Sequence, residues 1–300
     1  MAGCGDTGKL ADSSKRQSGN KYMSRTIGAL LITATLATGI MSATAAETPA
    51  VKLDPAQRSD VTGTVLITGS NRGIGLELAR NYAERGWTVI ATARRPASAD
   101  ALNEIASHHP RVTVERLDLL DHAGIDALAE KYRHIPIDVL LNNAAILGEP
   151  NDQLFGSLDY DLMNRVFAVN VIGSMKVAEA FAGSVEQSKL KKIVAITSTQ
   201  GSISSVRMPG LVFYKLSKAA LNMSMRSNSK SLKKRGVTVA LVSPGAVDTD
   251  MMNLALDRAG VKFKLLTPQQ SAEAVINIID QYGPDLTGTF MSHTGSVIPW

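Results

Sequence analysis

The stretch TVLITGSNRGIG at residues 64–75 decides the fold. Residues 64–69 are a short run rich in β-branched and aliphatic side chains, which predicts a buried strand. A helix is predicted over residues 73–85, because apolar residues recur there every fourth position and a glycine follows its end. A glycine-rich turn between a strand and a helix lets a phosphate group approach the helix N-terminus. The stretch therefore predicts the first strand, turn and helix of a nucleotide-binding α/β domain.

Strands and helices alternate through the rest of the chain. Further strands are predicted at 87–93, 112–118, 137–143, 192–198, 237–244 and 287–291, and further helices at 99–107, 122–132, 159–184, 213–235 and 269–281. Such alternation is typical of a parallel, doubly wound sheet with right-handed crossovers. We therefore expect a seven-stranded, mainly parallel sheet in a single domain over residues 63–300.

Charge and composition argue against nucleic-acid and metal chemistry. The chain carries a net charge of +5, but residues 1–46 alone hold five basic and two acidic residues, so only +2 remains for the rest. A basic nucleic-acid face is therefore not expected. The single cysteine, Cys4, allows no disulfide, and the five histidines lack the spacing of metal ligands. No metal is expected.

The N-terminal residues resemble a targeting leader. Residues 1–22 are polar, Met23 is a possible true start, and an uncharged apolar run at 27–41 precedes small residues up to Ala46. This pattern favours a signal peptide cleaved after Ala45 or Ala46, with a weak membrane anchor at 27–46 as the alternative. Residues 47–62 are interpreted as a linker. We expect an exported protein, periplasmic or secreted; a cytoplasmic or membrane-anchored protein is the alternative, with membrane contact only through residues 27–46 if they are uncleaved.

Arginines near the glycine turn indicate which cofactor would bind. Gly69, Gly73 and Gly75 form the turn, with Arg72 inside it. The second predicted strand ends in arginines at 94 and 95, where an NAD site usually has a carboxylate for the ribose hydroxyls. Guanidinium groups suit a 2′-phosphate, so NADP(H) is favoured over NAD(H). Solvated surface arginines are the alternative.

Tyr214 and Lys218 lie four residues apart in a predicted helix and so share one face. An ammonium group beside a phenol would lower the phenol's pKa. A shift of about three units requires about 4 kcal/mol, which one charge at about 4 Å supplies at an effective dielectric constant of about 20. The spacing alone arises readily by chance, so its meaning depends on the rest of the chain.

Six motifs in one order give the chain a family resemblance. They are the glycine turn, Asn142-Asn143-Ala144-Ala145, Asn170 in FAVNVIG, Ser198 in ITSTQG, Tyr214-x-x-x-Lys218, and Pro244-Gly245 with Thr249. In this order they resemble the short-chain dehydrogenase/reductase family over residues 63–300, in particular carbonyl reductases of the sniffer/C-factor type. The resemblance implies a Rossmann-type fold and an oxidoreductase with NADP(H). Ala145 departs from the glycine usual at its position in the family, and the 16-residue gap between Ser198 and Tyr214 is long.

The resemblance also implies roles for individual residues. Tyr214 would exchange a proton with the substrate oxygen, Lys218 would lower the pKa of Tyr214 and bind the nicotinamide ribose, Ser198 would hold the substrate oxygen, and Asn170 would hold a water. Asp118 would contact adenine, Asn142 its ribose, and Thr249 the nicotinamide amide. The implied cofactor-binding set is Gly69, Asn71, Arg72, Gly73, Ile74, Gly75, Arg94, Arg95, Asp118, Asn142, Ala144, Tyr214, Lys218, Pro244, Gly245, Val247 and Thr249.

The expected reaction is reversible reduction of a small, apolar aldehyde or ketone. Met251 and its apolar neighbours in residues 250–266 suggest an adaptable substrate wall, although they could equally be core residues of a short helix. A non-catalytic NADP(H)-binding regulator on the same fold is the alternative function. The sequence leaves the oligomeric state open, with a homodimer and a homotetramer as the alternatives. A secretory leader would deliver the enzyme to a compartment poor in NADP(H), so the predicted export and the predicted cofactor conflict.

Overall fold

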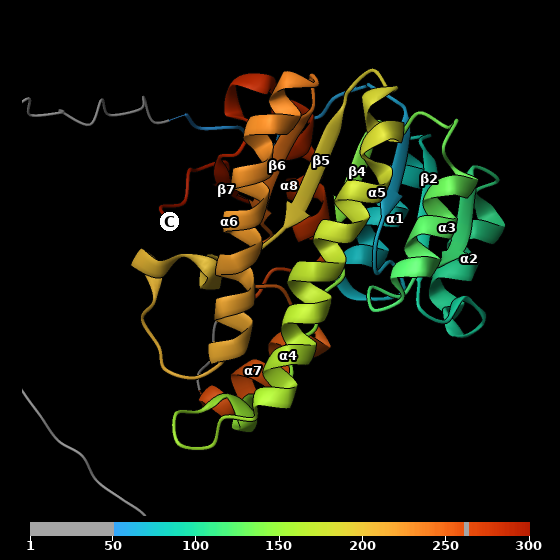
Figure 1. Cartoon of the computed structure of the whole chain (residues 1–300). Helices are drawn as coiled ribbons and strands as arrows, with labels where there is room; N and C mark the ends of the chain where they lie inside the picture. The colour runs from blue at the N-terminus through green and yellow to red at the C-terminus, as the bar shows by residue number, and fades with distance from the viewer. Residues whose placement is uncertain (1–50, 261–263) are drawn as a thin grey trace, which may run out of the picture. The chain divides into compact units, whose positions relative to one another are not determined.

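Seven parallel strands form one sheet at the centre of the described chain (Figure 1). The computed structural model describes residues 51–260 and 264–300. The predicted leader at 1–46 and the start of the predicted linker lie outside this part, so their interpretation stays a prediction. The predicted Rossmann-type, doubly wound α/β fold is confirmed, and the described residues belong to one compact unit, Glu47–Trp300.

The strand order creates a place for a ligand. From one edge to the other the order is β3-β2-β1-β4-β5-β6-β7. The strands are β1 (Thr64–Ile67), β2 (Thr88–Ala93), β3 (Val112–Arg116), β4 (Val139–Asn142), β5 (Lys192–Ile196), β6 (Thr238–Ser243) and β7 (Phe290–Ser292). Successive crossovers run in opposite directions on either side of the β1–β4 pair. Open α/β sheets bind ligands outside the carboxyl ends of the strands at such a point.

Helices cover both faces of the sheet (Figure 1). They are α1 (Gly73–Glu84), α2 (Asp100–His108), α3 (His122–Lys131), α4 (Tyr160–Phe167), α5 (Ser174–Glu186), α6 (Val212–Lys234), α7 (Asp250–Ala259) and α8 (Pro268–Gln281). One hydrophobic core joins the sheet to α1, α2 and α8, and a second joins it to α3, α5 and α6. The central strands are therefore buried on both faces, which explains their continuous apolar sequences.

The predicted helix at 159–184 is interrupted in the structure. Between α4 and α5 the backbone makes a wider, π-helical turn, η3 (Ala168–Gly173), and Asn170 lies within it. Tyr160–Glu186 as a whole is long and apolar enough to cross a membrane by length and composition alone. Val177 and Phe181 of this stretch are fully buried in the core beside the sheet, so packing within the domain accounts for its apolar face.

The described part of the predicted linker lies against the domain. The Leu53 amide donates to the Gly295 carbonyl, Asn277 donates to the Pro55 carbonyl, and the Trp87 indole donates to the Val61 carbonyl. Leu53, Pro55 and Val61 are thereby bound to the turn after β7, to α8 and to the residue just before β2. The boundary at residue 63 stays a prediction, although hydrogen bonds join both sides of it.

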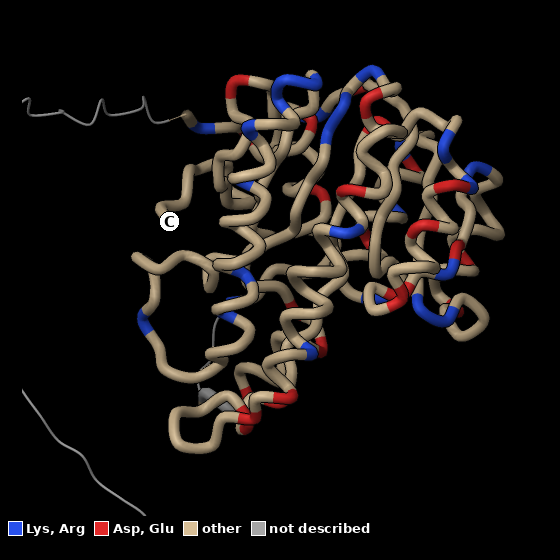
Figure 2. Tube along the Cα trace, in the orientation of Figure 1, with Lys and Arg blue, Asp and Glu red and all other residues tan. Residues whose placement is uncertain are grey.

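Charges are mixed over the described surface. Figure 2 shows Lys and Arg interspersed with Asp and Glu along this part of the chain. The residues described contain no group of three or more His, Cys, Asp or Glu side chains that could hold a metal ion. Neither observation points to a nucleic-acid or metal partner for this part of the protein.

Candidate active site

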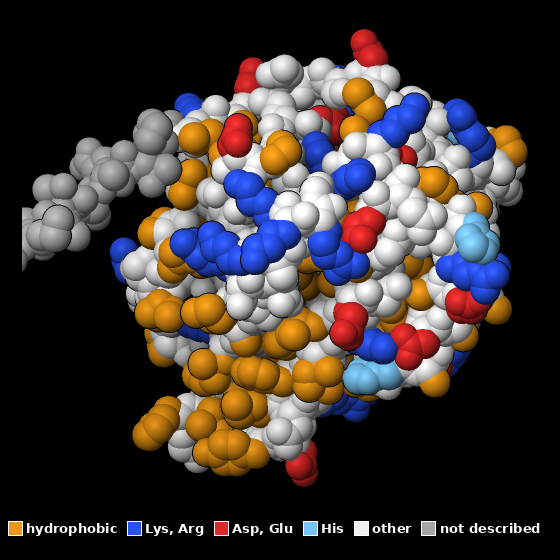
Figure 3. Space-filling model, turned by 45° about the horizontal axis from the view of Figure 1, so that its top comes forward, with side chains coloured by type: hydrophobic (Ala, Val, Ile, Leu, Met, Phe, Trp, Pro, Cys, Tyr) orange, Lys and Arg blue, Asp and Glu red, His pale blue; other side chains and the backbone are white. Residues whose placement is uncertain are grey.

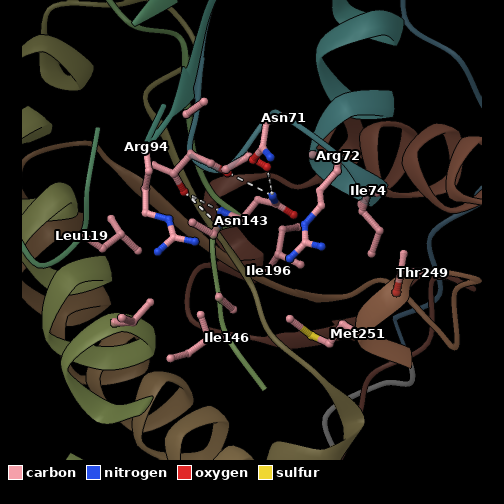
Figure 4. A pocket seen from close by; sticks show the side chains of 18 of the residues that line it. Asn71, Arg72, Ile74, Arg94, Leu119, Asn143, Ile146, Ile196, Thr249 and Met251 are labelled. Atoms are coloured by element: carbon pink, nitrogen blue, oxygen red, sulfur yellow. Dashed lines mark hydrogen bonds between the residues drawn. The ribbon is translucent and has the colours of Figure 1, made fainter. Parts of the chain in front are cut away.

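A cavity of about 740 Å³ opens at the carboxyl ends of the strands. Its wall is built from the segments that follow or end β1 to β6, so residues from distant parts of the chain meet there. Figure 4 shows Asn71, Arg72, Arg94, Asn143 and Met251 around this one space. Its size suits a small-molecule or cofactor site.

The glycine turn forms one wall, and its shape requires glycine. A Cβ atom on Gly75 would lie 2.1 Å from the carbonyl oxygen of Gly69, so no side chain fits there without a backbone shift. Arg72 occupies the N-cap of α1 and makes no side-chain cap bond. The N-terminus of α1 therefore has free backbone N–H groups and a partial positive charge for an anion.

Polar bonds join this turn to the segment after β4. The Thr68 hydroxyl accepts hydrogen bonds from the backbone amides of Asn143 and Ala144, both at 3.0 Å. The Asn143 side-chain amide donates to the Thr68 and Gly69 carbonyls. The turn is thus held in place by its neighbour in the sheet, and Asn143 becomes part of the cavity wall.

The three arginines predicted from the sequence, at positions 72, 94 and 95, all lie at the cavity wall. Arg72 forms an ion pair with Asp250 of α7, with its Nη1 at 2.7 Å from Oδ2. Arg94 reaches over the cavity in Figure 4. Within the described chain, Arg94 and Arg95 form no ion pair and are exposed, so both guanidinium groups are available to an anionic ligand.

Tyr214 and Lys218 both line the cavity and lie one turn apart on α6. The Lys218 ammonium lies 5.8 Å from the centre of the Tyr214 ring and donates to the Ile196 carbonyl at 2.9 Å. The predicted pairing of these residues on one helix face is therefore present.

Burial acts on the pKa values of this pair in opposite directions. It raises the pKa of the Tyr214 phenol, and a hydrogen bond with Ser198 partly opposes the increase. It lowers the pKa of Lys218 to about 8. The sequence predicts a tyrosine pKa lowered by the lysine. The structure shows a raised tyrosine pKa instead, because burial disfavours the charged form of each side chain: tyrosinate for Tyr214 and ammonium for Lys218.

Ser198 is brought to Tyr214 by a close approach of the backbone. Ser198 lies at the end of β5 and caps the short 3₁₀ turn η4 (Thr199–Gly201), where its hydroxyl accepts from the Gln200 amide. A Cβ atom on Gly201 would lie 2.7 Å from the Lys218 carbonyl carbon, so glycine allows this turn to pack directly on α6. This packing explains how Ser198 reaches Tyr214.

Asn170 lies behind the cavity wall rather than in it. Its side chain is fully buried; its oxygen accepts from the Ile146 amide, and its nitrogen donates to the Ile146 carbonyl, both at 2.8 Å. The same nitrogen donates to the Ser217 hydroxyl at 3.0 Å, and that hydroxyl donates to the Tyr214 carbonyl. Asn170 therefore links the segment after β4 to α6.

Most predicted cofactor-binding residues line the cavity, and three do not. Those on the wall are Gly69, Asn71, Arg72, Gly73, Ile74, Gly75, Arg94, Arg95, Asp118, Ala144, Tyr214, Lys218, Pro244 and Thr249. Asn142 is buried and donates to the Ser174 carbonyl at the start of α5. Val247 is buried beside Leu266, and Gly245 faces His293. For Asn142 the cause is alternation along β4, which turns Asn143 toward the cavity instead.

Other wall residues were not predicted from the sequence. Asn143 stands beside the predicted Asn142, and Thr68 directly follows β1, so strand geometry could have identified both. Arg165 lies near the end of α4 and lines the cavity only because α4 packs there. No sequence pattern distinguishes it from a solvated helix residue.

Comparison with known proteins identifies the family of the chain. The family model described as short chain dehydrogenase matches residues 63–259. The C-signal protein of Myxococcus xanthus is 34% identical over 165 residues, covering 55% of this chain and 93% of that protein. A carbonyl reductase from chicken fatty liver, solved with NADPH bound, is 27% identical, with a TM-score of 0.71 over 79% of this chain and 98% of its own.

A further solved structure is similar in fold. The carbonyl reductase Sniffer of D. melanogaster has a TM-score of 0.71 at 23% identity, covering 80% of this chain and all of its own. The predicted resemblance to the sniffer/C-factor type is confirmed by these relatives. With its model matched over more than half of its length, the chain belongs to the short-chain dehydrogenase family of oxidoreductases.

Proposed function

We propose that the protein is an NADP(H)-dependent oxidoreductase that reduces an aldehyde or ketone to an alcohol and can run the reverse reaction. The observation that carries this proposal is the meeting of Tyr214, Lys218 and Ser198 beside a cavity of cofactor size. A buried phenol that keeps its proton is suited to donate that proton to a carbonyl oxygen.

The cavity wall fits a dinucleotide that carries a 2′-phosphate. The crowded glycine turn and the uncapped N-terminus of α1 suit a pyrophosphate. Arg94 and Arg95, at the end of β2, suit the 2′-phosphate, with Arg72 as a third candidate. The NADPH bound to the chicken carbonyl reductase supports the same preference here. NAD(H) is the less favoured cofactor.

The chemistry assigned to the side chains is proton transfer and charge stabilisation. NADPH held by the glycine turn and the arginines would supply the hydride for the carbonyl carbon. Tyr214 Oη gives its proton to the substrate oxygen, and the Ser198 hydroxyl donates a hydrogen bond to the same oxygen. The Lys218 ammonium stabilises the tyrosinate that remains. In the reverse direction Tyr214 accepts the proton of the alcohol.

The surroundings of Tyr214 suggest an apolar substrate. Ile146, Ile196 and Met251 line the cavity. Hydrophobic side chains also gather on the lower part of the molecule in Figure 3, and Figure 1 places η2 (Pro150–Gln153), α7 and the start of α6 at that end. Phe155, just after η2, is 98% exposed. The apolar wall residues, and an apolar surface of this kind, favour hydrophobic over charged carbonyl compounds.

A substrate panel read out by NADPH absorbance tests the proposal. Aliphatic and aromatic aldehydes and ketones are offered with NADPH and, in parallel, with NADH. The proposal expects carbonyl-dependent oxidation of NADPH, with slower oxidation of NADH and poor use of carboxylated substrates. Tight NADPH binding without turnover of any substrate would instead favour a non-catalytic regulator that binds the cofactor.

A further inference from the structure

The helix that carries Tyr214 begins without a cap of its own. Leu211 occupies the N-cap of α6 in the left-handed conformation (φ 51°), and its side chain makes no cap bond. The first intrahelical bond at this end runs from the Lys215 amide to the Leu211 carbonyl. The three amides before Lys215, including that of Tyr214, need partners from outside the helix.

Gln153 supplies the partner for the Tyr214 amide. This glutamine ends η2, 61 positions earlier in the chain, and its side-chain oxygen accepts the Tyr214 N–H at 3.1 Å. Its exposed fraction is 0%. A buried amide at this place acts as a cap delivered from another element, in the role that a serine or aspartate usually fills within the helix itself.

The other end of the Gln153 amide is fixed as well. Its nitrogen donates to the Leu147 carbonyl at 2.9 Å and to the Glu149 carbonyl at 3.3 Å. With both donors used, only the oxygen can face Tyr214, so the partners determine the orientation of the amide. Among the common side chains of this length, only an amide offers two donors at one position and an acceptor beside them.

The main chain of Tyr214 is thus held on both sides. Gln153 binds its N–H, and the Ser217 hydroxyl binds its C=O. Ser217 in turn is bound by Asn170, which also holds both backbone groups of Ile146, directly before Leu147. Both bonds to Tyr214 therefore lead back to the short segment after β4 that lines the cavity.

We propose that Gln153 is a positioning residue for the reaction: it caps α6 at Tyr214 and fixes the phenol relative to the cavity. The effect on catalysis depends on the proposed function, whereas the capping of α6 does not. Misplacing a catalytic group by about 1 Å can reduce a rate by about 100-fold, so loss of this cap should act on turnover more than on binding.

Replacement of Gln153 by methionine tests this role. Gln153→Met keeps the length of the side chain and removes all three hydrogen bonds. We expect kcat for carbonyl reduction to fall about 10-fold to 100-fold, with the NADPH Kd changed less than about threefold. We also expect hydrogen exchange of the Tyr214 backbone amide to become at least about tenfold faster, because the amide loses its buried acceptor.

Gln187→Met is the matched control. Gln187 also donates to two backbone carbonyls, those of Arg133 and Gly183, but it lies at the end of α5 away from the cavity. Its variant should keep the kcat of the parent. Equal kcat for Gln153→Met and the parent, or equal loss in both glutamine variants, would overturn the proposal.

A second variant, Gln153→Glu, tests the same role if Gln153→Met does not fold. Gln153→Glu retains the acceptor for the Tyr214 amide but sets a carboxylate against two carbonyls. Its kcat relative to the parent should recover as pH falls, because the carboxyl group gains a proton and the conflict with the two carbonyls is relieved. A flat ratio would contradict the proposal. If no form of the protein turns over any carbonyl, the proposed function fails separately, and unchanged exchange at Tyr214 would then reject the cap too.

Discussion

Tyr214 and Lys218 show how burial changes the meaning of a short motif. In the free protein the pKa of Tyr214 is raised and that of Lys218 is lowered to about 8, in both cases chiefly because burial disfavours the charged form. The phenol therefore keeps its proton at neutral pH, which is the state that a reductase needs before hydride transfer. The lysine is most useful after proton transfer, when it faces a tyrosinate.

Lys218 gives a prediction for stability against pH. Its pKa of about 8 in the folded protein lies below the ordinary 10.5, so between these values the unfolded chain binds more protons and stability rises with pH. Relative to Lys218→Met, the parent should gain about 3 kcal/mol in free energy of unfolding between pH 7 and pH 10.5. Urea denaturation at both pH values measures this gain, and other titrating groups cancel in the comparison. A constant difference between the two proteins would contradict the burial of a titrating lysine.

Arg94 gives a prediction for cofactor choice. Arg94→Ala should weaken NADPH binding by about 10-fold to 100-fold and leave NADH binding within about twofold, because only NADPH carries the 2′-phosphate. Fluorescence titration measures both dissociation constants. Arg133→Ala serves as the control, because Arg133 forms a surface ion pair with Glu130 near the end of α3. Equal weakening of NADPH and NADH binding would show that Arg94 does not contact the 2′-phosphate.

At the scale of the elements, most strands and helices could be predicted from sequence periodicity. All seven predicted strands are present, although β7 begins at Phe290 rather than 287. The main differences are local. The turn η3 interrupts the helix predicted at 159–184. Asn170 lies in this turn and forms hydrogen bonds with Ile146 and Ser217, and such contacts cannot be seen in the periodicity of the sequence. Helix α7 stands in the predicted substrate wall and begins at the cap formed by Thr249.

Helix α7 is joined to the glycine turn by an exposed ion pair, and this gives a further prediction. Asp250→Asn releases Arg72 and removes a carboxylate from the cavity wall. An exposed pair contributes about 0–1 kcal/mol, so Tm should change by only a few degrees. NADPH should bind about two- to tenfold more tightly at low salt, and NADH less so, because a negative charge near the phosphates is lost.

The control for Asp250→Asn is Asp126→Asn on α3, which breaks another surface pair, with Lys176. NADPH affinity should be unchanged in that variant. Weaker NADPH binding in Asp250→Asn would show that the pair supports the cofactor site rather than competing with it.

At the scale of the whole molecule, the site depends on residues from the ends of six strands and from α1, α4, α6, α7 and α8. The ordered motifs predicted Tyr214, Lys218, the glycine turn and the arginines, because each motif sits at a strand end or on one helix face. Gln153 and Arg165 could not be predicted, since their roles come from contacts between elements far apart in the sequence. Asn143, rather than the predicted Asn142, lines the cavity because a strand alternates its side chains between two sides.

The N-terminal leader gives a prediction at the same scale. If residues 23–46 act as a signal peptide, the mature protein should begin at Ala46 or Glu47, next to the segment that binds the domain from Leu53 onward. Mass spectrometry of protein purified from its native source measures the first residue. A chain that still contains residues 27–46 would argue against cleavage and favour an anchor or a cytoplasmic protein.

The central claim is that Tyr214 transfers the proton during carbonyl reduction. Tyr214→Phe removes only the phenolic oxygen, and Tyr160→Phe, at an exposed tyrosine of α4, is the matched control. Turnover and NADPH binding are measured for both variants with the best substrate of the panel. The account predicts a loss of kcat of at least about 100-fold for Tyr214→Phe, with NADPH affinity nearly unchanged and Tyr160→Phe fully active. Undiminished turnover in Tyr214→Phe would contradict it.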